Sequence, residues 1–366
     1  MTRSVPVLMY HYISRWKNPI AVSPELFEEH CATMARKGWR GIGLDEAEDF
    51  FIQGKPLPDK SVLITFDDGF LDNYVYAFPI LEKYGHKGTI FAVTGKIETG
   101  ETPRNTLKQV WNNECSADAL PRVDQPYVPH ALGFDERTDH FISWEEARLM
   151  EKSGVVRVSS HSAWHKTVFV SPEYDGFFQP GKRSRTFDRV DAEVIWGLPR
   201  FKNRPRLSNR AFIPSSRLMD AIRDLVPQEK EAAYAFFAEA DNVERLKTLV
   251  EGFSKEELGT YEDDMAMQGA LRQELAEAKA TVEQKLGRPE RSLCWPWGAF
   301  SPDALSIGKD LGYQCFFTTN MGANPGGCAD HVHRFKAKDK PASWMMMRLQ
   351  IYSRPWLANL YSSIRL

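Results

Sequence analysis

Hydrophobic and polar positions alternate in blocks along the first half of the chain, and the blocks predict strands and helices in turn. The apolar runs that favour strands lie at residues 5–10, 40–44, 61–69, 88–93 and 155–159. Each is short and contains β-forming residues, which is typical of strands buried in a parallel sheet. The stretches that favour helices lie at residues 23–38, 45–53, 73–84 and 143–152. This alternation predicts an α/β fold with a mainly parallel sheet or barrel.

Two longer stretches interrupt the alternation and are predicted to be insertions. Residues 96–139 have no clear period and many polar and proline residues, so we expect a long loop insertion there. Residues 171–260 carry helical patterns, which predict a mostly helical insertion or small subdomain. A stronger helical pattern at 261–286 then leads back to strand-forming sequence. We therefore expect a single domain over residues 1–366 that contains both insertions.

Composition and charge argue against several classes of protein. The chain has 366 residues with 47 basic and 49 acidic side chains, and its formal net charge of -2 does not predict nucleic-acid binding. The N-terminus is too polar for a signal peptide, and no apolar run is long enough for a transmembrane segment. The five cysteines lack the spacing of a disulfide framework. These features predict a soluble cytoplasmic protein and leave its oligomeric state open.

The candidate chemistry begins where the third predicted strand ends, at Asp67-Asp68-Gly69. Active sites of barrels and open α/β folds lie at the C-terminal ends of parallel strands. A glycine at this point allows the chain to turn and bring both carboxylates into one pocket. One carboxylate can then bind a cation while the other stays free as a base. The alternative is an ordinary Asp-Asp-Gly turn without a chemical role.

His161 and His165 form a second candidate site, directly after the predicted strand at 155–159. Residues four apart in a helical turn or a compact loop can direct both imidazoles at one cation. Together with Asp68 they would supply two nitrogens and one oxygen, which matches the three protein ligands of a catalytic zinc-type site. The alternative is a pair of surface histidines that flank Trp164 by chance.

Three motifs, taken in order, resemble a known family. They are Thr65-Phe66-Asp67-Asp68-Gly69, His161-Ser162-Ala163-Trp164-His165 and Trp295-Pro296-Trp297-Gly298. Together they resemble the NodB-homology polysaccharide deacetylases of carbohydrate esterase family 4. The opening Pro6-Val7-Leu8-Met9-Tyr10-His11 is similar to the subgroup that includes the poly-N-acetylglucosamine deacetylases. The resemblance covers residues 5–95, 140–170 and 275–335, and neither insertion carries a motif of the family.

The resemblance implies a fold, a cofactor and roles for individual residues. The fold is a distorted (β/α) barrel. The cofactor is a divalent metal, with zinc in first place and nickel, cobalt, iron or manganese as alternatives. Asp68, His161 and His165 would be the metal ligands, and Asp67 the catalytic base. The backbone N–H of Trp297 would help to hold the oxyanion of the reaction.

Other parts of the implied site are less complete. The general acid would be His11, because an imidazolium suits that task near neutral pH, and His333 is a weaker rival. Many family members orient the base with an arginine at the position that is Cys294 here, so the partner of Asp67 is not named. Trp297 replaces the tyrosine of the family's Pro-Tyr-Gly, which keeps the backbone donor but changes the pocket wall.

Three tryptophans are candidates for substrate binding, because together they would form a flat apolar wall for a sugar ring. They are Trp164, Trp295 and Trp297. The alternative for Trp295 and Trp297 is ordinary packing in the core.

The expected function is metal-dependent removal of acetyl from an N-acetylated amino sugar, in a glycan or in a lipid- or nucleotide-linked precursor of a cell-surface polysaccharide. The alternatives are an O-acetyl esterase on the same site and a catalytically inactive glycan-binding barrel. The insertion at 171–260 is expected to border the substrate cleft and set specificity. Its basic residues would either meet a pyrophosphate or form a solvated surface. They include Lys182, Arg183, Arg185, Arg200, Lys202, Arg204, Arg206 and Arg210.

Overall fold

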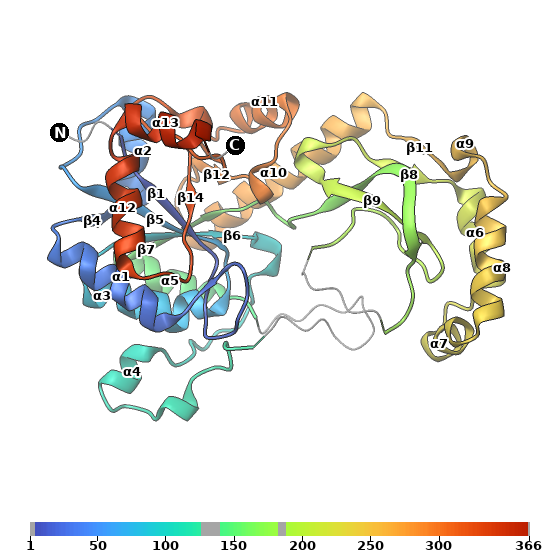
Figure 1. Cartoon of the computed structure of the whole chain (residues 1–366), viewed down its shortest axis with the longest axis horizontal. Coiled ribbons are helices and arrows are strands. Elements are labelled where there is room, and N and C mark those ends of the chain that lie inside the picture. The colour runs from blue at the N-terminus through green and yellow to red at the C-terminus, as the bar shows by residue number, and fades with distance from the viewer. Residues whose placement is uncertain (1–3, 126–139, 182–187, 365–366) are drawn as a thin grey trace.

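The computed structural model describes residues 4–125, 140–181 and 188–364, which form a larger and a smaller lobe (Figure 1). In this part of the chain the larger lobe contains one 8-stranded sheet in the order β13-β12-β7-β6-β5-β1-β14, with β4 paired to β5. Its strands are β1 (Val7–Tyr10), β4 (Arg40–Ile42), β5 (Ser61–Asp68), β6 (Gly88–Ala92), β7 (Val156–Ser160), β12 (Ser292–Cys294), β13 (Cys315–Phe317) and β14 (Phe335–Lys336). All of these pairings are parallel, which confirms the predicted α/β barrel with mainly parallel strands.

Helices of the larger lobe surround this sheet (Figure 1). They are α1 (Pro24–Arg36), α2 (Leu44–Gln53), α3 (Phe78–Lys83), α4 (Leu107–Trp111), α5 (Trp144–Lys152), α10 (Asp264–Leu286), α11 (Pro302–Asp310), α12 (Ala342–Tyr352) and α13 (Pro355–Ile364). The hydroxyl of Ser143 accepts from the backbone of Glu146 and completes a capping box at the start of α5. Ser23 donates its hydroxyl to Asp339, and α1 begins without a side-chain cap. The helices α12 and α13 were not predicted.

A short segment at residues 332–336 closes the sheet into a barrel. Val332 forms a parallel bridge with Phe317 of β13, and Phe335 pairs with Leu8 of β1. The segment therefore lies in the seam between the two edges of the sheet. This position places the side chain of Arg334 inside the barrel, where it is buried.

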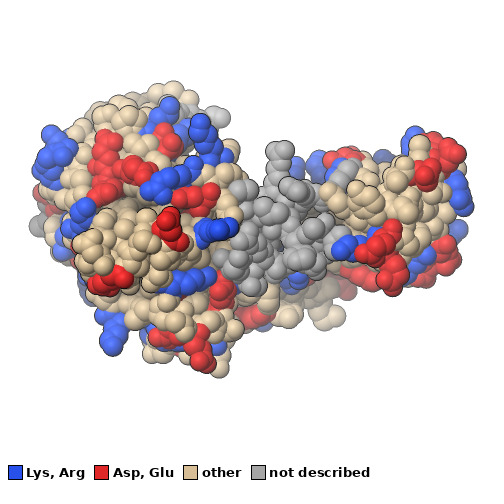
Figure 2. Space-filling view, turned by 90° about the horizontal axis from the view of Figure 1, so that it is seen from below, with Lys and Arg blue, Asp and Glu red and all other residues tan. Residues whose placement is uncertain are grey.

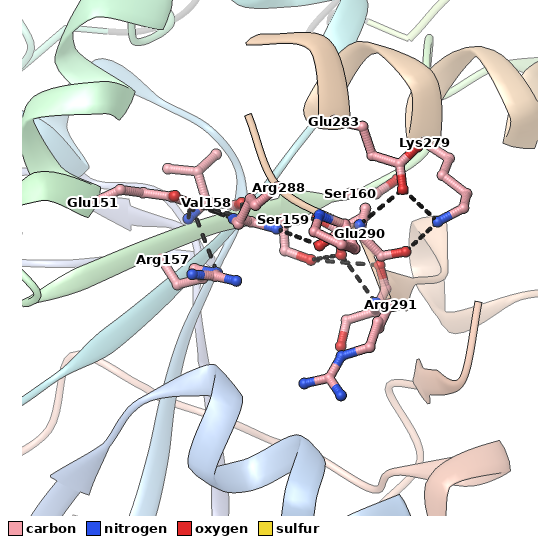
Figure 3. Close-up of polar contacts among 12 residues, drawn as sticks. Glu151, Arg157, Val158, Ser159, Ser160, Lys279, Glu283, Arg288, Glu290 and Arg291 are labelled. Atoms are coloured by element: carbon pink, nitrogen blue, oxygen red, sulfur yellow. Dashed lines mark hydrogen bonds and ion pairs between the residues drawn. The ribbon is translucent and has the colours of Figure 1, made fainter. Parts of the chain in front are cut away.

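A buried polar network joins the C-terminal half of β7 to the start of β12 (Figure 3). The register of these strands contains only one residue pair, so side chains supplement a short pairing. The Oε1 of Glu290 accepts from the hydroxyl of Ser159 at 2.8 Å and from the backbone N–H of Ser292 at 2.9 Å. Arg288 binds both Glu290 and Glu151, which ties the network to α5. These contacts hold the start of β12 beside the end of β7 from which the chain continues to His161.

The smaller lobe is formed by residues that leave the barrel after β7 and return through α10. Its strands pair antiparallel, and they are β8 (Thr167–Phe177) with β9 (Pro199–Pro205) and β10 (Phe212–Pro214) with β11 (Gly259–Tyr261). Its helices are α6 (Ser216–Leu225), α7 (Lys230–Ala238), α8 (Ala240–Glu251) and α9 (Lys255–Leu258). The helices agree with the mostly helical prediction, whereas the long hairpin was missed. A separate hydrophobic cluster, which includes Phe169, Phe201 and Ile222, fills the lobe.

Charged side chains of both signs are mixed over the face seen in Figure 2, as the small net charge leads one to expect. In the described residues, no helix is apolar enough over a sufficient length to cross a membrane. The predicted loop insertion at 96–139 contains the short helix α4, and its portion from 126 to 139 lies outside the described residues.

Candidate active site

Asp67 and Asp68 end β5 at the C-terminal edge of the sheet, where both are buried. Asp68 has a φ of +75° and Gly69 a φ of +83°, so the chain turns through two successive left-handed residues. A Cβ on Gly69 would lie 3.1 Å from the Cβ of Ala92, which favours glycine for packing as well as for conformation. A left-handed aspartate is strained, and such strain is common where function requires it. This turn brings the two neighbouring carboxylates into one site.

Asp68 faces the two histidines that follow β7. Its Oδ1 lies 3.5 Å from Nε2 of His161 and 3.7 Å from Nε2 of His165. One ligand atom from each of the three residues lies within 4.8 Å of the other two. These separations exceed those of good direct hydrogen bonds, which are about 2.7–3.2 Å, but they suit three ligands around one cation.

The remaining ring nitrogens hold both imidazoles in one tautomer. Nδ1 of His161 lies 2.8 Å from the carbonyl oxygen of Cys294, and Nδ1 of His165 lies 2.5 Å from Oδ1 of Asp188. Both partners are acceptors, so we assign the ring hydrogen to each Nδ1, which leaves each Nε2 lone pair for a metal. Asp188 belongs to the smaller lobe and was not singled out in the sequence. The donor set therefore fits a divalent cation such as zinc.

The electrostatics of these residues also fit a cation. Burial raises the pKa of Asp68 to about 7; His165 opposes this rise, and the neighbouring Asp67 adds to it. Burial lowers the pKa of His161 to about 3, so its ring is neutral, as a metal ligand must be. A bound divalent cation would favour the charged form of Asp68 and offset the repulsion between the carboxylates.

Arg334 is the partner of Asp67 that the sequence analysis did not name. Its side chain is fully buried, and its Nη1 and Nη2 donate to Oδ1 and Oδ2 of Asp67 at 2.6 and 2.8 Å. The guanidinium also donates to the carbonyl oxygen of Thr318 at 2.8 Å. Burial alone would raise the pKa of Asp67, but Arg334, His161 and His11 outweigh it and hold this pKa well below its usual range. Asp67 is therefore an ionised carboxylate in a fixed orientation.

Only the tertiary structure identifies Arg334, because its approach to Asp67 depends on the seam of the barrel. In the sequence it follows His333, which we considered as a rival general acid. The two neighbouring side chains diverge. His333 lines a pocket with Phe51 and Asn359, whereas Arg334 binds Asp67. The sequence shows only that Arg334 lies close to a strand-forming segment. Many arginines share that feature, so it does not identify the partner of Asp67.

His11 lies beside the base, but it is not an imidazolium at neutral pH. Its Nε2 is 4.0 Å from Oδ2 of Asp67, and its Nδ1 is buried without a hydrogen-bond partner in the described structure. Burial lowers the pKa of His11 to about 4, and the attraction of Asp67 only partly compensates. His11 thus lies beside the predicted base, and its burial favours the neutral imidazole.

The three candidate tryptophans occupy different environments. Trp297 is 39% exposed, and its ring centroid lies 3.9 Å from that of His165, so it can form a wall beside the candidate metal site. Trp295 is fully buried between Phe300 and Phe316, which corrects its assignment as a substrate-binding residue. Trp164 is partly buried.

The backbone at Trp297 is also unusual. Trp297 has a φ of +54°, and a Cβ on Gly298 would lie 2.2 Å from Oγ1 of Thr319. Thr319 also donates its hydroxyl to the carbonyl oxygen of Trp297 at 3.1 Å. The Trp-Gly turn is therefore closely packed, which fixes the peptide that is expected to serve as an oxyanion donor.

The basic residues of the smaller lobe do not form a free cationic cluster in the part that is described. Arg206 is buried, and it binds Glu262 through two contacts of 2.5 and 2.9 Å, so it is not available to a pyrophosphate. Several others are paired with carboxylates: Arg200 with Asp175, Lys202 with Glu173 and Arg210 with Asp264. Lys182, Arg183 and Arg185 lie outside the described residues.

Comparison with curated proteins relates the chain to deacetylases. Residues 54–193 match the polysaccharide deacetylase family. The chain is 44% identical over 93 residues to YxkH of Bacillus subtilis (strain 168), which is 25% of this chain and 33% of that protein. It is 22% identical over 234 residues to the poly-beta-1,6-N-acetyl-D-glucosamine N-deacetylase of Escherichia coli (strain K12), which is 63% of this chain and 30% of that protein. The matched regions thus span about a third of the length of these relatives.

Comparison with solved structures shows that the fold resembles those of two deacetylases. The de-N-acetylase from Aggregatibacter actinomycetemcomitans has a TM-score of 0.59 and 18% identity, over 94% of this chain and 99% of that chain. The deacetylase domain of BpsB from Bordetella bronchiseptica has a TM-score of 0.56 and 19% identity, over 92% of this chain and 96% of that chain. Because both likenesses extend over almost the whole chain, they include the smaller lobe as well as the barrel.

Proposed function

We propose that this chain, whose residues 54–193 match the polysaccharide deacetylase family, hydrolyses the acetamide of N-acetylglucosamine residues in a polysaccharide, with a divalent metal as cofactor. One observation carries the proposal: two adjacent carboxylates have different partners. Asp68 faces His161 and His165, whereas Asp67 is bound by Arg334. This difference supports a ligand and a base, which are the two functions that the hydrolysis requires.

The three ligand residues would hold the metal at the end of β5. A divalent cation bound by Asp68, His161 and His165 would supply polarisation of the acetyl carbonyl and of the attacking water. Zinc is the metal that we propose, because two imidazole nitrogens and one carboxylate oxygen form a common catalytic zinc set. Asp188 and the carbonyl of Cys294 would orient the two imidazoles through their Nδ1 hydrogens.

Asp67 is the proposed general base. Because Arg334 keeps it ionised and fixes both of its oxygens, it can take a proton from the water that attacks the acetyl carbon. The peptide N–H of Trp297 is the proposed donor to the oxygen that becomes negatively charged.

His11 is the proposed donor to the departing nitrogen. It starts neutral, so it must first receive a proton, and its Nε2 lies 4.0 Å from Asp67. We propose that the proton taken from water passes from Asp67 to His11 and then to the nitrogen as the C–N bond breaks. His11→Ala should therefore reduce hydrolysis of an amide far more than that of an activated ester, whose leaving group hardly needs a proton. Equal losses on the two substrates would contradict this role.

The proposed substrate class is a polymer of N-acetylglucosamine, as in the name of the Escherichia coli relative. The exposed indole of Trp297 would offer an apolar face to a sugar ring beside the reacting acetamide. We propose that this reaction modifies a cell-surface polysaccharide or its precursor.

The test is acetate release from defined substrates. The purified protein is assayed with β-1,6- and β-1,4-linked N-acetylglucosamine oligomers, a lipid-linked acetamido sugar and an O-acetylated sugar, with and without a chelator. We expect release from an N-acetylglucosamine oligomer that stops with chelator and returns with zinc. Asp68→Asn should release no acetate under any of these conditions. Release that is insensitive to the chelator and equal in Asp68→Asn would refute the proposal, and release from the O-acetylated sugar alone would indicate an esterase.

A further inference from the structure

The loop that carries both histidines has an unfavourable backbone. Ser162 and His165 have φ values of +66° and +54°. Non-glycine residues seldom adopt such values, and each costs of the order of 1 kcal/mol unless the surroundings impose it. On one side of the loop, the N–H of Gly95 donates to the carbonyl oxygen of Ala163 at 2.8 Å. On the same side, the N–H of Thr94 donates to the carbonyl oxygen of Ser162 at 3.2 Å, so backbone contacts hold Ser162 and Ala163.

Glu274 holds the loop from the other side. It lies on α10, and its side chain is almost completely buried. Its Oε1 accepts from the backbone N–H of Trp164 at 2.7 Å, and the nearby hydroxyl of Ser162 favours the ionised form of the carboxylate. The Ser162 oxygen in turn accepts from the backbone N–H of His165 at 3.1 Å. Glu274 thus holds the loop at Trp164, next to the candidate metal ligand His165, and lies near the Ser162 hydroxyl that caps the His165 N–H.

The presence of a carboxylate at this position needs a reason. The other buried residues of α10 are apolar, and they are Met267, Leu271, Leu275, Ala278 and Val282. Burial raises the pKa of Glu274, which shows that its charged form is costly there. An apolar residue would therefore suit the helix better if packing were its only task. The hydrogen bond that Glu274 accepts from the backbone of Trp164 explains why a carboxylate occupies this position.

We infer that Glu274 is a positioning residue, which holds the loop of His161 and His165 in the geometry that binds the metal. This inference rests on the proposed function for the identity of the ligands. It assigns Glu274 no contact with substrate, and its effect passes through Trp164 and Ser162. Because α10 follows directly from the smaller lobe, the same helix connects that lobe to the ligand loop.

Glu277 offers a matched control on the same helix. Its Oε1 accepts from the indole Nε1 of Trp164 at 3.0 Å, so it fixes the ring of Trp164 but not the backbone of the loop. Replacing Glu277 removes a carboxylate contact to the same tryptophan and leaves the proposed positioning contacts intact.

The experiment compares Glu274→Met, Glu274→Gln and Glu277→Met in the full chain. Methionine fills a similar volume without a good acceptor, whereas glutamine keeps an oxygen for the Trp164 N–H. Zinc affinity is measured by competition with a chromophoric chelator, and the ligand geometry by the absorption spectrum of the cobalt-loaded protein. We expect Glu274→Met to weaken zinc binding by about tenfold or more and to change the spectrum. By the same reasoning, the zinc affinity of Glu274→Gln should fall about threefold. The zinc affinity and cobalt spectrum of Glu277→Met should match those of the wild type.

Hydrogen exchange of the metal-free protein supplies a readout that does not depend on the metal. We expect the amides of Trp164 and His165 to exchange faster in Glu274→Met than in Glu277→Met. Wild-type zinc affinity and wild-type exchange in Glu274→Met would overturn the inference. If the wild type and His161→Ala bind zinc equally, the proposed function fails, and amide exchange still decides the role of Glu274. If circular dichroism shows Glu274→Met unfolded, exchange at His165 in Glu274→Gln decides, and an unchanged rate there would overturn the inference.

Discussion

The barrel and the smaller lobe each contain a buried arginine that binds a carboxylate with both of its terminal nitrogens. In the barrel Arg334 binds Asp67, and in the smaller lobe Arg206 binds Glu262. The two pairs have similar distances and burial, but their surroundings differ. Asp67 lies beside a second carboxylate and two histidines, whereas Glu262 accepts a further hydrogen bond from the backbone of Ala211. A buried ion pair is therefore no sign of catalysis by itself, and the neighbouring groups distinguish a base from a structural clamp.

The largest difference between the two pairs should appear when each carboxylate is neutralised. Asp67→Asn should lower turnover at least about a thousandfold, because the base is lost, while the metal stays bound. Glu262→Gln should keep turnover within a few-fold of the wild type in the folded protein. Acetate release and the metal content of both purified variants are the measurements. If Asp67→Asn loses its metal, Asp67 is a ligand and the assignment of the two carboxylates is wrong.

Arg334→Met should impair both activity and stability. We expect kcat/KM to fall about a hundredfold, because the base loses its orientation, and the free energy of unfolding to fall by about 3 kcal/mol, because a buried carboxylate loses its partner. Arg334 lowers the pKa of Asp67, so its stabilisation is present above the unfolded pKa of about 4 and is lost as the pH falls. Denaturant unfolding should show the gap to wild type shrinking below that pH. A gap that widens in acid would contradict this account.

Arg206→Met should lower the stability of the protein but leave its catalytic activity almost unchanged. Loss of the buried pair should lower the free energy of unfolding by about 3 kcal/mol, since Glu262 is left without its cation. The Michaelis constant and kcat of the folded fraction should stay within about threefold of the wild type, because the ligand and base residues keep their contacts. Denaturant unfolding and steady-state kinetics on the same preparation test both parts. A loss of activity as large as that of Arg334→Met would remove the distinction between the two pairs.

Asp188→Ala tests the one side chain of the smaller lobe that reaches a candidate metal ligand in the described structure. Without the acceptor at its Nδ1, His165 should bind zinc about tenfold more weakly. Asp191→Ala is the control, because Asp191 lies in the same segment but pairs with Lys166 and Arg206 and not with a candidate ligand. Zinc competition titrations on both variants decide the matter. Equal affinities in the two variants would restrict the smaller lobe to a structural or substrate-binding role.

Arg204→Glu should have the smallest effect. Arg204 donates to the carbonyl oxygen of Asn203 at the exposed end of β9, and its basic neighbours Arg200 and Lys202 are paired with carboxylates. We expect the Michaelis constant for a lipid-linked acetamido sugar to change less than about twofold, as is usual for an exposed residue away from the site. A large increase on that substrate, without a change on a neutral oligomer, would restore phosphate binding by this lobe.

The sequence by itself determined the elements that obey a regular period. The strand that ends in Asp67-Asp68 and the helix that begins after Ser143 were predicted from local patterns, because burial on both faces and hydrogen bonds at helix ends restrict the residue types found there. The ligand set of Asp68, His161 and His165 came from motifs, and the structure places these three side chains together. The long hairpin of β8 and β9 has a weaker sequence pattern, because its register shifts interrupt the alternation of inward and outward residues.

Only the tertiary structure decided which residues support the site. Arg334 lies 267 positions from Asp67, and Glu274 lies 110 positions from Trp164. Neither contact can be predicted from nearby residues in the sequence. A buried arginine or glutamate is stabilised by a partner that only the fold brings close, and its neighbours in the chain do not identify that partner. The same reason separates Trp295 from Trp297, two residues apart: one packs in the core and the other stands beside His165. Periodicity records which face of an element is apolar, whereas charge pairing across the barrel exists only after the chain has closed it.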